Sequence, residues 1–234
     1  MGTRPSELFH LFGDLNNLPG IGPKTVINLK NLSIEKPRDF LFNLPFSVLD
    51  RLPVSSIRGV SASQIVTVEV LVKAHKIGRS RASAYRVTVQ DTEVTFQLVF
   101  FNARKEYLES LLPVGERRIV SGKLEFYDNT PQVVHPHHIK KINDEKAIAR
   151  FEPVYPLTSG ISQKLMYGTI IGLLEKLPKL GEWIDKEVLK IRGWPSWQDA
   201  LRSAHYPVSA DVASNTDPAR LRLAFDELFS HQLS

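Results

Sequence analysis

Residues 64–101 decide the fold, and they contain three patterned stretches: QIVTVEVLVK (64–73), AYRVTVQ (84–90) and VTFQLVFF (94–101). In each stretch apolar residues, mostly β-branched or aromatic, alternate with polar ones. A period of two over five or more residues is typical of a strand with one buried face. The three stretches therefore predict three consecutive strands that share one core.

The residues that follow extend this pattern into a barrel. Residues 103–112 have helical spacing and end before Pro113 and Gly115, and two more strand patterns follow at 117–126 and 131–139. Asp128 and Asn129 between them are typical turn residues. The order of three strands, one helix and two strands matches the five-stranded Greek-key barrel called the OB-fold. Five short strands are also compatible with an SH3-like barrel, but a helix between the third and fourth strands favours the OB-fold.

Helical patterns flank the predicted barrel on both sides. Residues 6–51 contain short helices around a Pro-Gly-Ile-Gly-Pro break at 19–23, and an extended segment at 151–155 precedes helical stretches at 162–179, 181–190 and 196–205. A last helix begins with a cap at Asp217 and continues to the end of the chain without a stop signal, so we expect it to continue further. The fold class is α+β. The predicted domains are an N-terminal helical segment (1–60), an OB-fold barrel (61–145) and a C-terminal helical segment (146–234).

Composition limits the classes of function. The 234 residues include no cysteine, which excludes disulfides, thiolate metal sites and cysteine nucleophiles. No run of apolar residues approaches the ~18 that a membrane span needs, and the start lacks a secretory pattern, so we expect a cytoplasmic monomer that does not enter membranes. The net charge is +5, and residues 64–142 contain 12 Lys and Arg against 8 Asp and Glu. The positive excess therefore lies mostly in the barrel, where a polyanion could bind.

Seven cations are the candidates for contact with a nucleic-acid backbone. Five of them form a run without an acidic residue, and the other two lie further along the barrel: Lys73, Lys76, Arg79, Arg81, Arg86, Arg104 and Lys123. The alternative is a solvated loop whose charges only keep the chain soluble. We expect the run to follow phosphates.

Phe101 is the candidate for base stacking. Alternation sends Val94, Phe96, Leu98 and Phe100 into the barrel, which leaves Phe101 on the outside. A base stacked on such a ring contributes about 1–3 kcal/mol. Tyr107, in the following helix, is a second candidate. The alternative is that helices of the same chain cover the Phe101 ring.

A further candidate is the turn that contains Gly20, Gly22 and Lys24. It is similar to a helix-hairpin-helix turn, in which amides at a helix N-terminus bind one backbone phosphate. The alternative is a tight turn without a ligand. It is not a nucleotide-binding P-loop, because the spacing differs and Pro23 stands where an amide donor is needed.

Catalytic and metal-binding patterns are absent from the sequence. Alternation sends His135 and His137 to one face and His138 to the other, so these histidines are expected to be surface groups near a phosphate and not metal ligands. The neighbouring carboxylates Asp226 and Glu227 diverge on a helix and are expected to be solvated. We therefore predict no catalytic site, no metal and no cofactor in this stretch.

Several segments together resemble the N-terminal portion of the RecG family of bacterial ATP-dependent DNA helicases. They are LPGIGPK (18–24), DFLFNLP (39–45), DR (50–51), FFN (100–102), VSGK (120–123), VHP (134–136), PVYPLT (153–158), AHYP (204–207) and RLRLAFDEL (220–228). Their order and spacing cover nearly the whole chain from Leu15 onward. No single segment is decisive, but together they are specific.

The resemblance implies a wedge that binds branched DNA, such as a replication fork or a Holliday junction, in recombination and repair. It implies that Phe101 stacks on the base exposed where the strands separate. Family members often have a second aromatic residue four positions later, where this chain has Lys105. A motor that uses ATP and Mg²⁺ should follow Ser234, single-strand-binding protein is a possible partner, and the location should be the cytoplasm near the nucleoid.

Two other functions fit the residues. OB-folds also bind peptides, and Trp183, Trp194 and Trp197 could face a protein partner. OB-folds of the anticodon-binding kind bind RNA, and a preference for folded RNA over forked DNA would identify this class.

Overall fold

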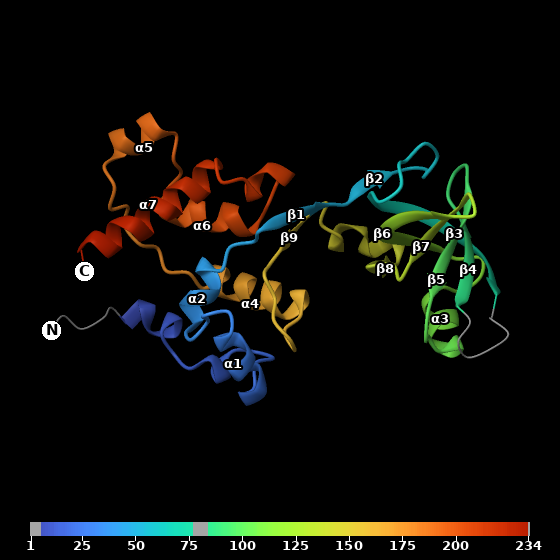
Figure 1. Ribbon diagram of the computed structural model, residues 1–234, viewed down its shortest axis with the longest axis horizontal. Coiled ribbons are helices and arrows are strands. Elements are labelled where there is room, and N and C mark those ends of the chain that lie inside the picture. The colour runs from blue at the N-terminus through green and yellow to red at the C-terminus, as the bar shows by residue number, and fades with distance from the viewer. Residues whose placement is uncertain (1–5, 77–83, 234) are drawn as a thin grey trace. The chain divides into compact units, whose positions relative to one another are not determined.

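The computed structural model describes residues 6–76 and 84–233 and divides the chain into two compact units. One unit is the segment 50–150, and the other combines residues 1–49 with residues 151–234. Figure 1 shows the strands of the first unit and the helices of the second. The chain thus passes between the units twice, at 49–50 and at 150–151.

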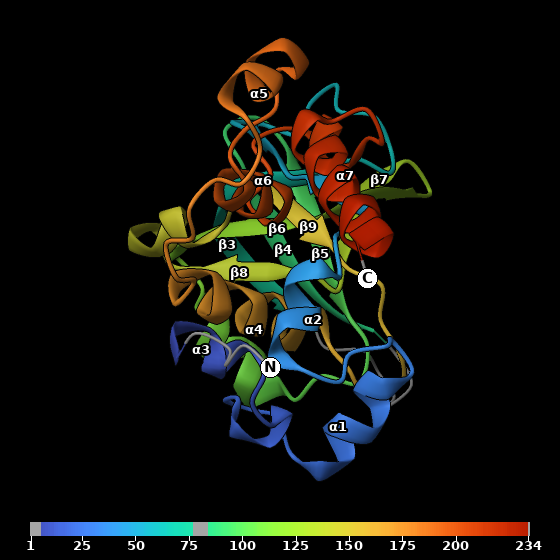
Figure 2. The same cartoon turned by 90° about the vertical axis from the view of Figure 1, so that its left-hand side faces the viewer.

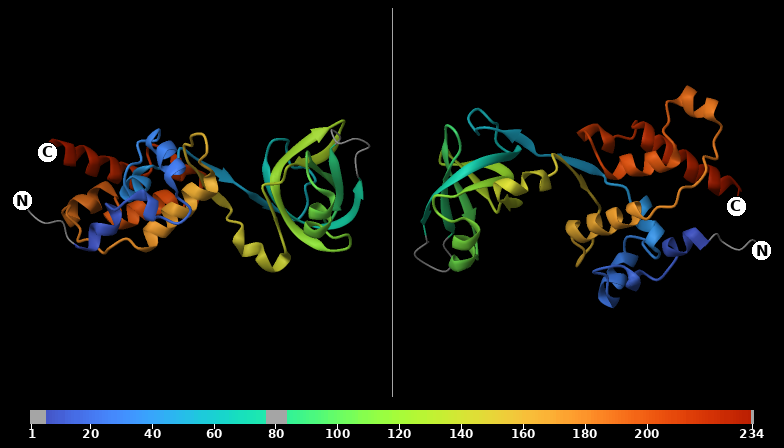
Figure 3. Two further views of the ribbon diagram at one scale, coloured as in Figure 1. Left: turned by 90° about the horizontal axis from the view of Figure 1, so that it is seen from below. Right: turned by 180° about the vertical axis from the view of Figure 1, so that it is seen from behind.

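The unit of residues 50–150 is a closed barrel. Its strands are β2 (Leu52–Val54), β3 (Ile65–Lys76), β4 (Tyr85–Gln90), β5 (Thr95–Phe100), β6 (Arg117–Tyr127), β7 (Thr130–Val134) and β8 (His138–Lys140). They follow the order β2-β3-β4-β5-β7-β6-β8, and a further pairing of β3 with β6 closes the ring, which Figure 3 shows. The helix α3 (Lys105–Leu111) lies between β5 and β6 in the chain, and the short helix η3 (Ile142–Ala147) follows β8. The predicted OB-type barrel is confirmed.

Alternation of side chains builds the barrel core as predicted. Val87, Phe96 and Leu98 are fully buried in it, and Leu108 and Leu112 from α3 and its end pack against the same core. Asp128 and Asn129 both have positive φ, 47° and 58°, so the β6–β7 turn has the backbone typical of a two-residue hairpin. The predicted turn is therefore present.

The predicted last strand, 131–139, is divided in the structure. β7 ends at Val134, and β8 begins at His138 and pairs with β6. His135 between them has φ of 45°, which no strand residue adopts, and Pro136 lacks the amide that a ladder needs. The segment 135–137 therefore interrupts the pairing, and β7 and β8 lie one after the other along the edge of β6 that faces away from β3.

The second unit is helical. It contains η1 (Ser6–Leu11), η2 (Leu15–Asn17), α1 (Pro23–Lys30), α2 (Pro37–Phe42), α4 (Gln163–Glu175), α5 (Lys186–Arg192), α6 (Trp197–His205), η4 (Ala210–Ala213) and α7 (Pro218–Leu233). A two-stranded sheet joins β1 (Ser47–Asp50) to β9 (Phe151–Val154). Figure 2 faces this unit; α2 packs on α4, α4 on α6, and α6 on α7.

The two terminal segments of the chain share one hydrophobic core. Phe40 and Leu41 from the N-terminal segment pack with Met166, Ile170 and Leu201 from the C-terminal segment, and all five are buried. Residues 50–60 belong to the barrel unit, since β2 pairs in parallel with β3 and Ile57 is buried in the barrel core. The units therefore differ in their limits from the ranges 1–60, 61–145 and 146–234. Within the described residues, no helix is long and apolar enough to cross a membrane.

Candidate nucleic-acid interface

The outward-pointing side chains of β4 and β5 form one polar surface, which we call the outer face. They are Arg86, Thr88 and Gln90 on β4 and Thr95 and Gln97 on β5, whereas Val99, next in the same alternation, is buried. Thr88 lies opposite Gln97, and Gln97 Nε2 donates a hydrogen bond to Thr88 Oγ1 at 3.2 Å. Gln132 on β7 lies beside Gln97 and extends the face. These two strands are the second and third of the barrel, the pair whose face binds oligonucleotides in OB-folds.

Phe101 stands at one end of the outer face. It follows Phe100, the last residue of β5, and 48% of its surface is exposed, whereas Phe100 lies in the core. The expected exposure of Phe101 is therefore present, and no helix of the barrel unit seals the ring. Its ring centroid lies 5.7 Å from that of His135. A half-exposed ring at the end of a polar strand is available for stacking on a base.

Two cations belong to the rung of the sheet that contains Val99, two residues before Phe101. Lys76 on β3 pairs with Arg86 on β4, and Arg86 pairs with Val99, two residues before Phe101. Both cations are exposed. Arg86 is therefore the diagonal neighbour of Phe101, a spacing that long side chains can span.

The other predicted cations are more scattered. Lys73 is exposed in a bulge of β3, Arg104 is the N-cap of α3, and Lys123 on β6 has its amine 3.9 Å from Glu125. Arg79 and Arg81 lie outside the described residues. The structure thus groups Lys76 and Arg86 with Phe101, and gives Lys123 an acidic neighbour.

Two further aromatic residues of the barrel unit are exposed, and one histidine contacts Phe101. Tyr107 is 63% exposed on α3 but makes no ring contact with Phe101 among the described residues. Tyr127, at the β6–β7 hairpin, is 61% exposed. It is not among the aromatic residues predicted from the sequence, although its place beside the Asp128–Asn129 turn indicates an exposed position. His135 was expected near a phosphate; the structure places its Nε2 3.2 Å from the backbone nitrogen of Phe101.

His135 and His137 contact different parts of the barrel unit. His137 Nδ1 lies 3.1 Å from Arg51 NH1, while His135 contacts Phe101, so the two rings serve different neighbours. Among the described residues no group of three or more potential ligands is close enough to hold a metal ion.

The glycine turn lies in the helical unit. Gly20 has φ of 77°, Gly22 is the N-cap of α1, and Pro23 is its first residue, followed by exposed Lys24. Proline has no amide hydrogen, so the first donors of α1 come from Lys24 and Thr25. The turn has the backbone of a helix N-terminus but does not form a loop that could surround a nucleotide triphosphate.

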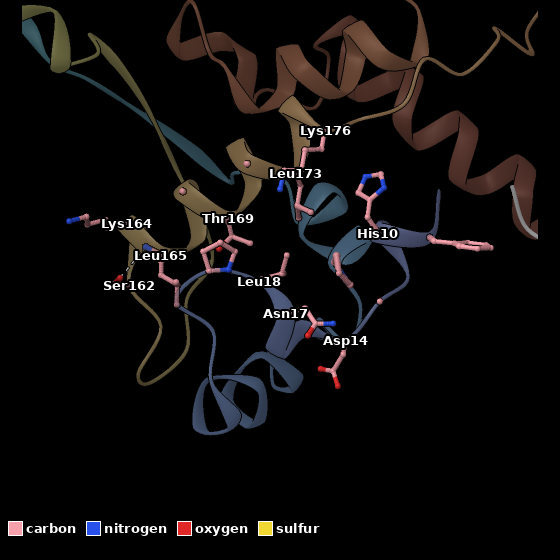
Figure 4. A pocket seen from close by; sticks show the side chains of 16 residues that line it. His10, Asp14, Asn17, Leu18, Ser162, Lys164, Leu165, Thr169, Leu173 and Lys176 are labelled. Atoms are coloured by element: carbon pink, nitrogen blue, oxygen red, sulfur yellow. Dashed lines mark hydrogen bonds between the residues drawn. The ribbon is translucent and has the colours of Figure 1, made fainter. Parts of the chain in front are cut away.

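A groove of about 850 Å³ lies beside this turn, between α4 and the segments η1 and η2 (Figure 4). Leu18, Leu165 and Leu173 line it, and Lys164 and Lys176 stand at its rim. Asp14 is the one carboxylate among the described residues of its lining, and its Oδ1 already accepts hydrogen bonds from Asn16. His10 and the two lysines are the other titratable residues of the lining.

A closed OB-type barrel places the chain in the class of OB-fold proteins. A family model described as the RecG wedge domain matches residues 14–173. The chain therefore belongs to the RecG wedge-domain family, and the resemblance predicted from the sequence is confirmed.

Curated relatives agree with this family. The ATP-dependent DNA helicase RecG of Haemophilus influenzae is 27% identical over 230 residues, which cover 94% of this chain and 32% of the relative. RecG of Thermotoga maritima is 29% identical over 97% of this chain and 29% of its own length. A solved structure of RecG bound to a three-way DNA junction matches with a TM-score of 0.74 and 26% identity, over 94% of this chain and 30% of that chain. The chain thus spans about a third of the length of these relatives.

Proposed function

We propose that this chain binds the branch point of forked DNA with the outer face of its barrel and separates the strands there, as the wedge of an ATP-dependent DNA helicase. The observation that carries this proposal is the half-exposed ring of Phe101 at the end of β5, two residues beyond the rung that carries Lys76 and Arg86. The solved RecG structure bound to a three-way junction supports a branched substrate.

The mechanism follows from the geometry of the face. Where two strands separate, the last base of one strand loses its partner, and an aromatic ring can replace the lost stacking. Cations beside the ring then hold the phosphates that enter and leave the branch. Gln97 and Gln132 offer amide groups to a strand that crosses the face. The closed barrel keeps the ring fixed while the duplex moves past it.

ATP hydrolysis with Mg²⁺ belongs in this proposal to the rest of a longer helicase. The glycine turn of this chain does not fit a nucleotide triphosphate, because Pro23 occupies the position where a P-loop needs an amide. The contribution of this chain is thus to bind and position DNA. Single-strand-binding protein, the monomeric state and a place near the nucleoid remain predictions.

Replacing Phe101 with alanine tests the proposal. The variant should bind a three-way fork about 5- to 150-fold more weakly, because a base stacked on an aromatic ring contributes about 1–3 kcal/mol. Binding to plain duplex should stay the same, since no base is exposed there. The measurement is a titration of labelled fork, duplex and single-stranded DNA with the chain at one salt concentration.

Phe9→Ala is the matched control, because Phe9 is similarly exposed (59%) but belongs to the helical unit. Equal fork affinity of Phe101→Ala and the unmodified chain would refute the stacking role. Equal affinity of the unmodified chain for fork, duplex and single strand would remove the preference for branches. Tighter binding to folded RNA, or no salt-dependent DNA binding at all, would favour the RNA-binding or protein-binding alternative.

A further inference from the structure

His135 makes two hydrogen bonds that continue the β5–β7 ladder past its end. Its backbone nitrogen donates to the Val99 carbonyl at 2.9 Å, as a strand residue would. Its side chain then takes the place of the next carbonyl, since Nε2 lies 3.2 Å from the Phe101 nitrogen and accepts its hydrogen. The amide of Phe101, one residue beyond β5, thus has an imidazole as its partner where the strand has none.

The ring of His135 also touches the candidate stacking residue. The centroids of the His135 and Phe101 rings are 5.7 Å apart at an interplanar angle of 42°, and the Phe100 ring meets His135 edge-on at 6.2 Å. The imidazole therefore lies against both phenylalanines, one buried and one exposed. It supports the exposed ring from the side and fixes its backbone.

The backbone of His135 has an unusual conformation. Its φ of 45° is in the left-handed region, which non-glycine residues seldom occupy. Pro136 follows and further restricts the residue before it. Strained residues of this kind persist only where surrounding contacts determine them, and they are concentrated at functional sites. Here the conformation turns the side chain back toward the end of β5.

We propose that His135 is a positioning residue that holds Phe101 in the orientation in which it receives an unpaired base. The inference rests on the proposed stacking role of Phe101. A mobile ring would lose conformational entropy when a base stacks on it. The hydrogen bond from the Phe101 amide to His135 restricts this residue before DNA binds, so less entropy is lost on binding. Since Nε2 must accept, the neutral ring carries its hydrogen on Nδ1.

Two variants separate the backbone from the side chain. His135→Gly relieves the left-handed strain and removes both the acceptor and the ring. His135→Asn tolerates the same backbone and keeps an acceptor on a shorter side chain. Each is made in the full 234-residue chain, alone and together with Phe101→Ala.

The first measurement is hydrogen exchange at the Phe101 amide in the free protein. His135→Gly should speed exchange at this amide at least about tenfold, while His135→Asn keeps part of the protection. The second is fork affinity, together with the fluorescence of 2-aminopurine at the unpaired position of the fork. His135→Gly should bind forks at least about threefold more weakly and quench the probe less, without a change in duplex affinity.

The double variant decides the role. If His135 acts through Phe101, Phe101→Ala combined with His135→Gly should bind forks no more weakly than Phe101→Ala alone. Losses that multiply would overturn the inference, because His135 would then contact DNA independently. Unchanged exchange at the Phe101 amide in His135→Gly would also overturn it. If Phe101→Ala alone leaves fork binding intact, the proposed function fails, whereas the exchange measurement still reports whether His135 holds this amide.

Discussion

His205 is buried in the core of the helical unit, and both of its ring nitrogens have partners. Nε2 donates to the Leu41 carbonyl at 2.8 Å, and Nδ1, 3.0 Å from the Tyr155 hydroxyl, accepts its hydrogen. Burial raises the pKa of Tyr155, so its hydroxyl keeps its hydrogen. A carbonyl accepts only, so this arrangement needs a neutral imidazole with its hydrogen on Nε2. One side chain thus joins α2, α6 and the segment after β9.

Burial lowers the pKa of His205 to about 4. Between pH 6.5 and about 4 the unfolded chain binds a proton at this position that the folded chain does not, so stability should fall as the pH falls through this range. The expected loss is about 3 kcal/mol over the whole range. Urea unfolding at pH 7, 5.5 and 4.5 measures it.

His205→Gln is the control for this prediction, because glutamine can also donate and accept but does not titrate. The variant should be less stable at pH 7 and should lose less stability on acidification than the unmodified chain. Parallel losses in both proteins would show that other groups cause the pH dependence.

Among the elements, β6 depends on a glycine. A Cβ on Gly122 would overlap Val133 Cγ1 on the neighbouring strand and lie 3.2 Å from Pro136 Cα, where the backbone cannot move aside easily. The missing side chain lets the segment between β7 and β8 lie close to β6. It explains in physical terms why the segment 120–123 contains a glycine inside a strand.

Gly122→Ala should therefore destabilise the barrel by about 1–3 kcal/mol, the usual cost of overpacking. Gly168→Ala on α4 is the opposite case, since a Cβ there meets nothing within 4 Å. Alanine in a helix interior is favoured over glycine by about 0.8–1 kcal/mol, so this variant should be slightly more stable. Thermal unfolding shows whether each variant is more or less stable than the unmodified chain. A Gly122→Ala variant of unchanged stability would show that Val133 and Pro136 can move away from β6.

The elements also show how far the sequence predicts the structure. The barrel strands and the exposure of Phe101 follow from a period of two, which depends on neighbouring residues alone. The break at His135 does not, because nothing in VHP (134–136) signals a left-handed histidine. The prediction that Asp226 is solvated is wrong. Its side chain is 13% exposed and forms an ion pair with Arg222, which is fully buried. That burial depends on packing of α7 against distant residues such as Glu182, which Arg222 also binds.

In the whole molecule, the positive charge is distributed unevenly in a way that matters for binding. The chain has a net charge of +5, and residues 64–142 contain 12 of its 30 Lys and Arg. Within the barrel, Lys76 and Arg86 belong to one rung of the sheet beside Phe101. Stacking and charge should therefore contribute to fork binding in separable ways, since stacking releases no counterions.

Salt dependence separates the two contributions. Each phosphate neutralised by a cation adds about 0.9 to the slope of log affinity against log salt for duplex and about 0.7 for a single strand. Replacing Lys76 and Arg86 with glutamine should therefore lower the slope for forks by about 1.4–1.8, whereas Phe101→Ala should weaken binding without changing the slope. The same salt titration with Lys24→Gln tests whether the glycine turn in the helical unit contacts a phosphate. An unchanged slope after loss of both barrel cations would mean that the phosphates lie elsewhere, and a lower slope in Phe101→Ala would mean that the ring orders the path of the backbone as well as the base.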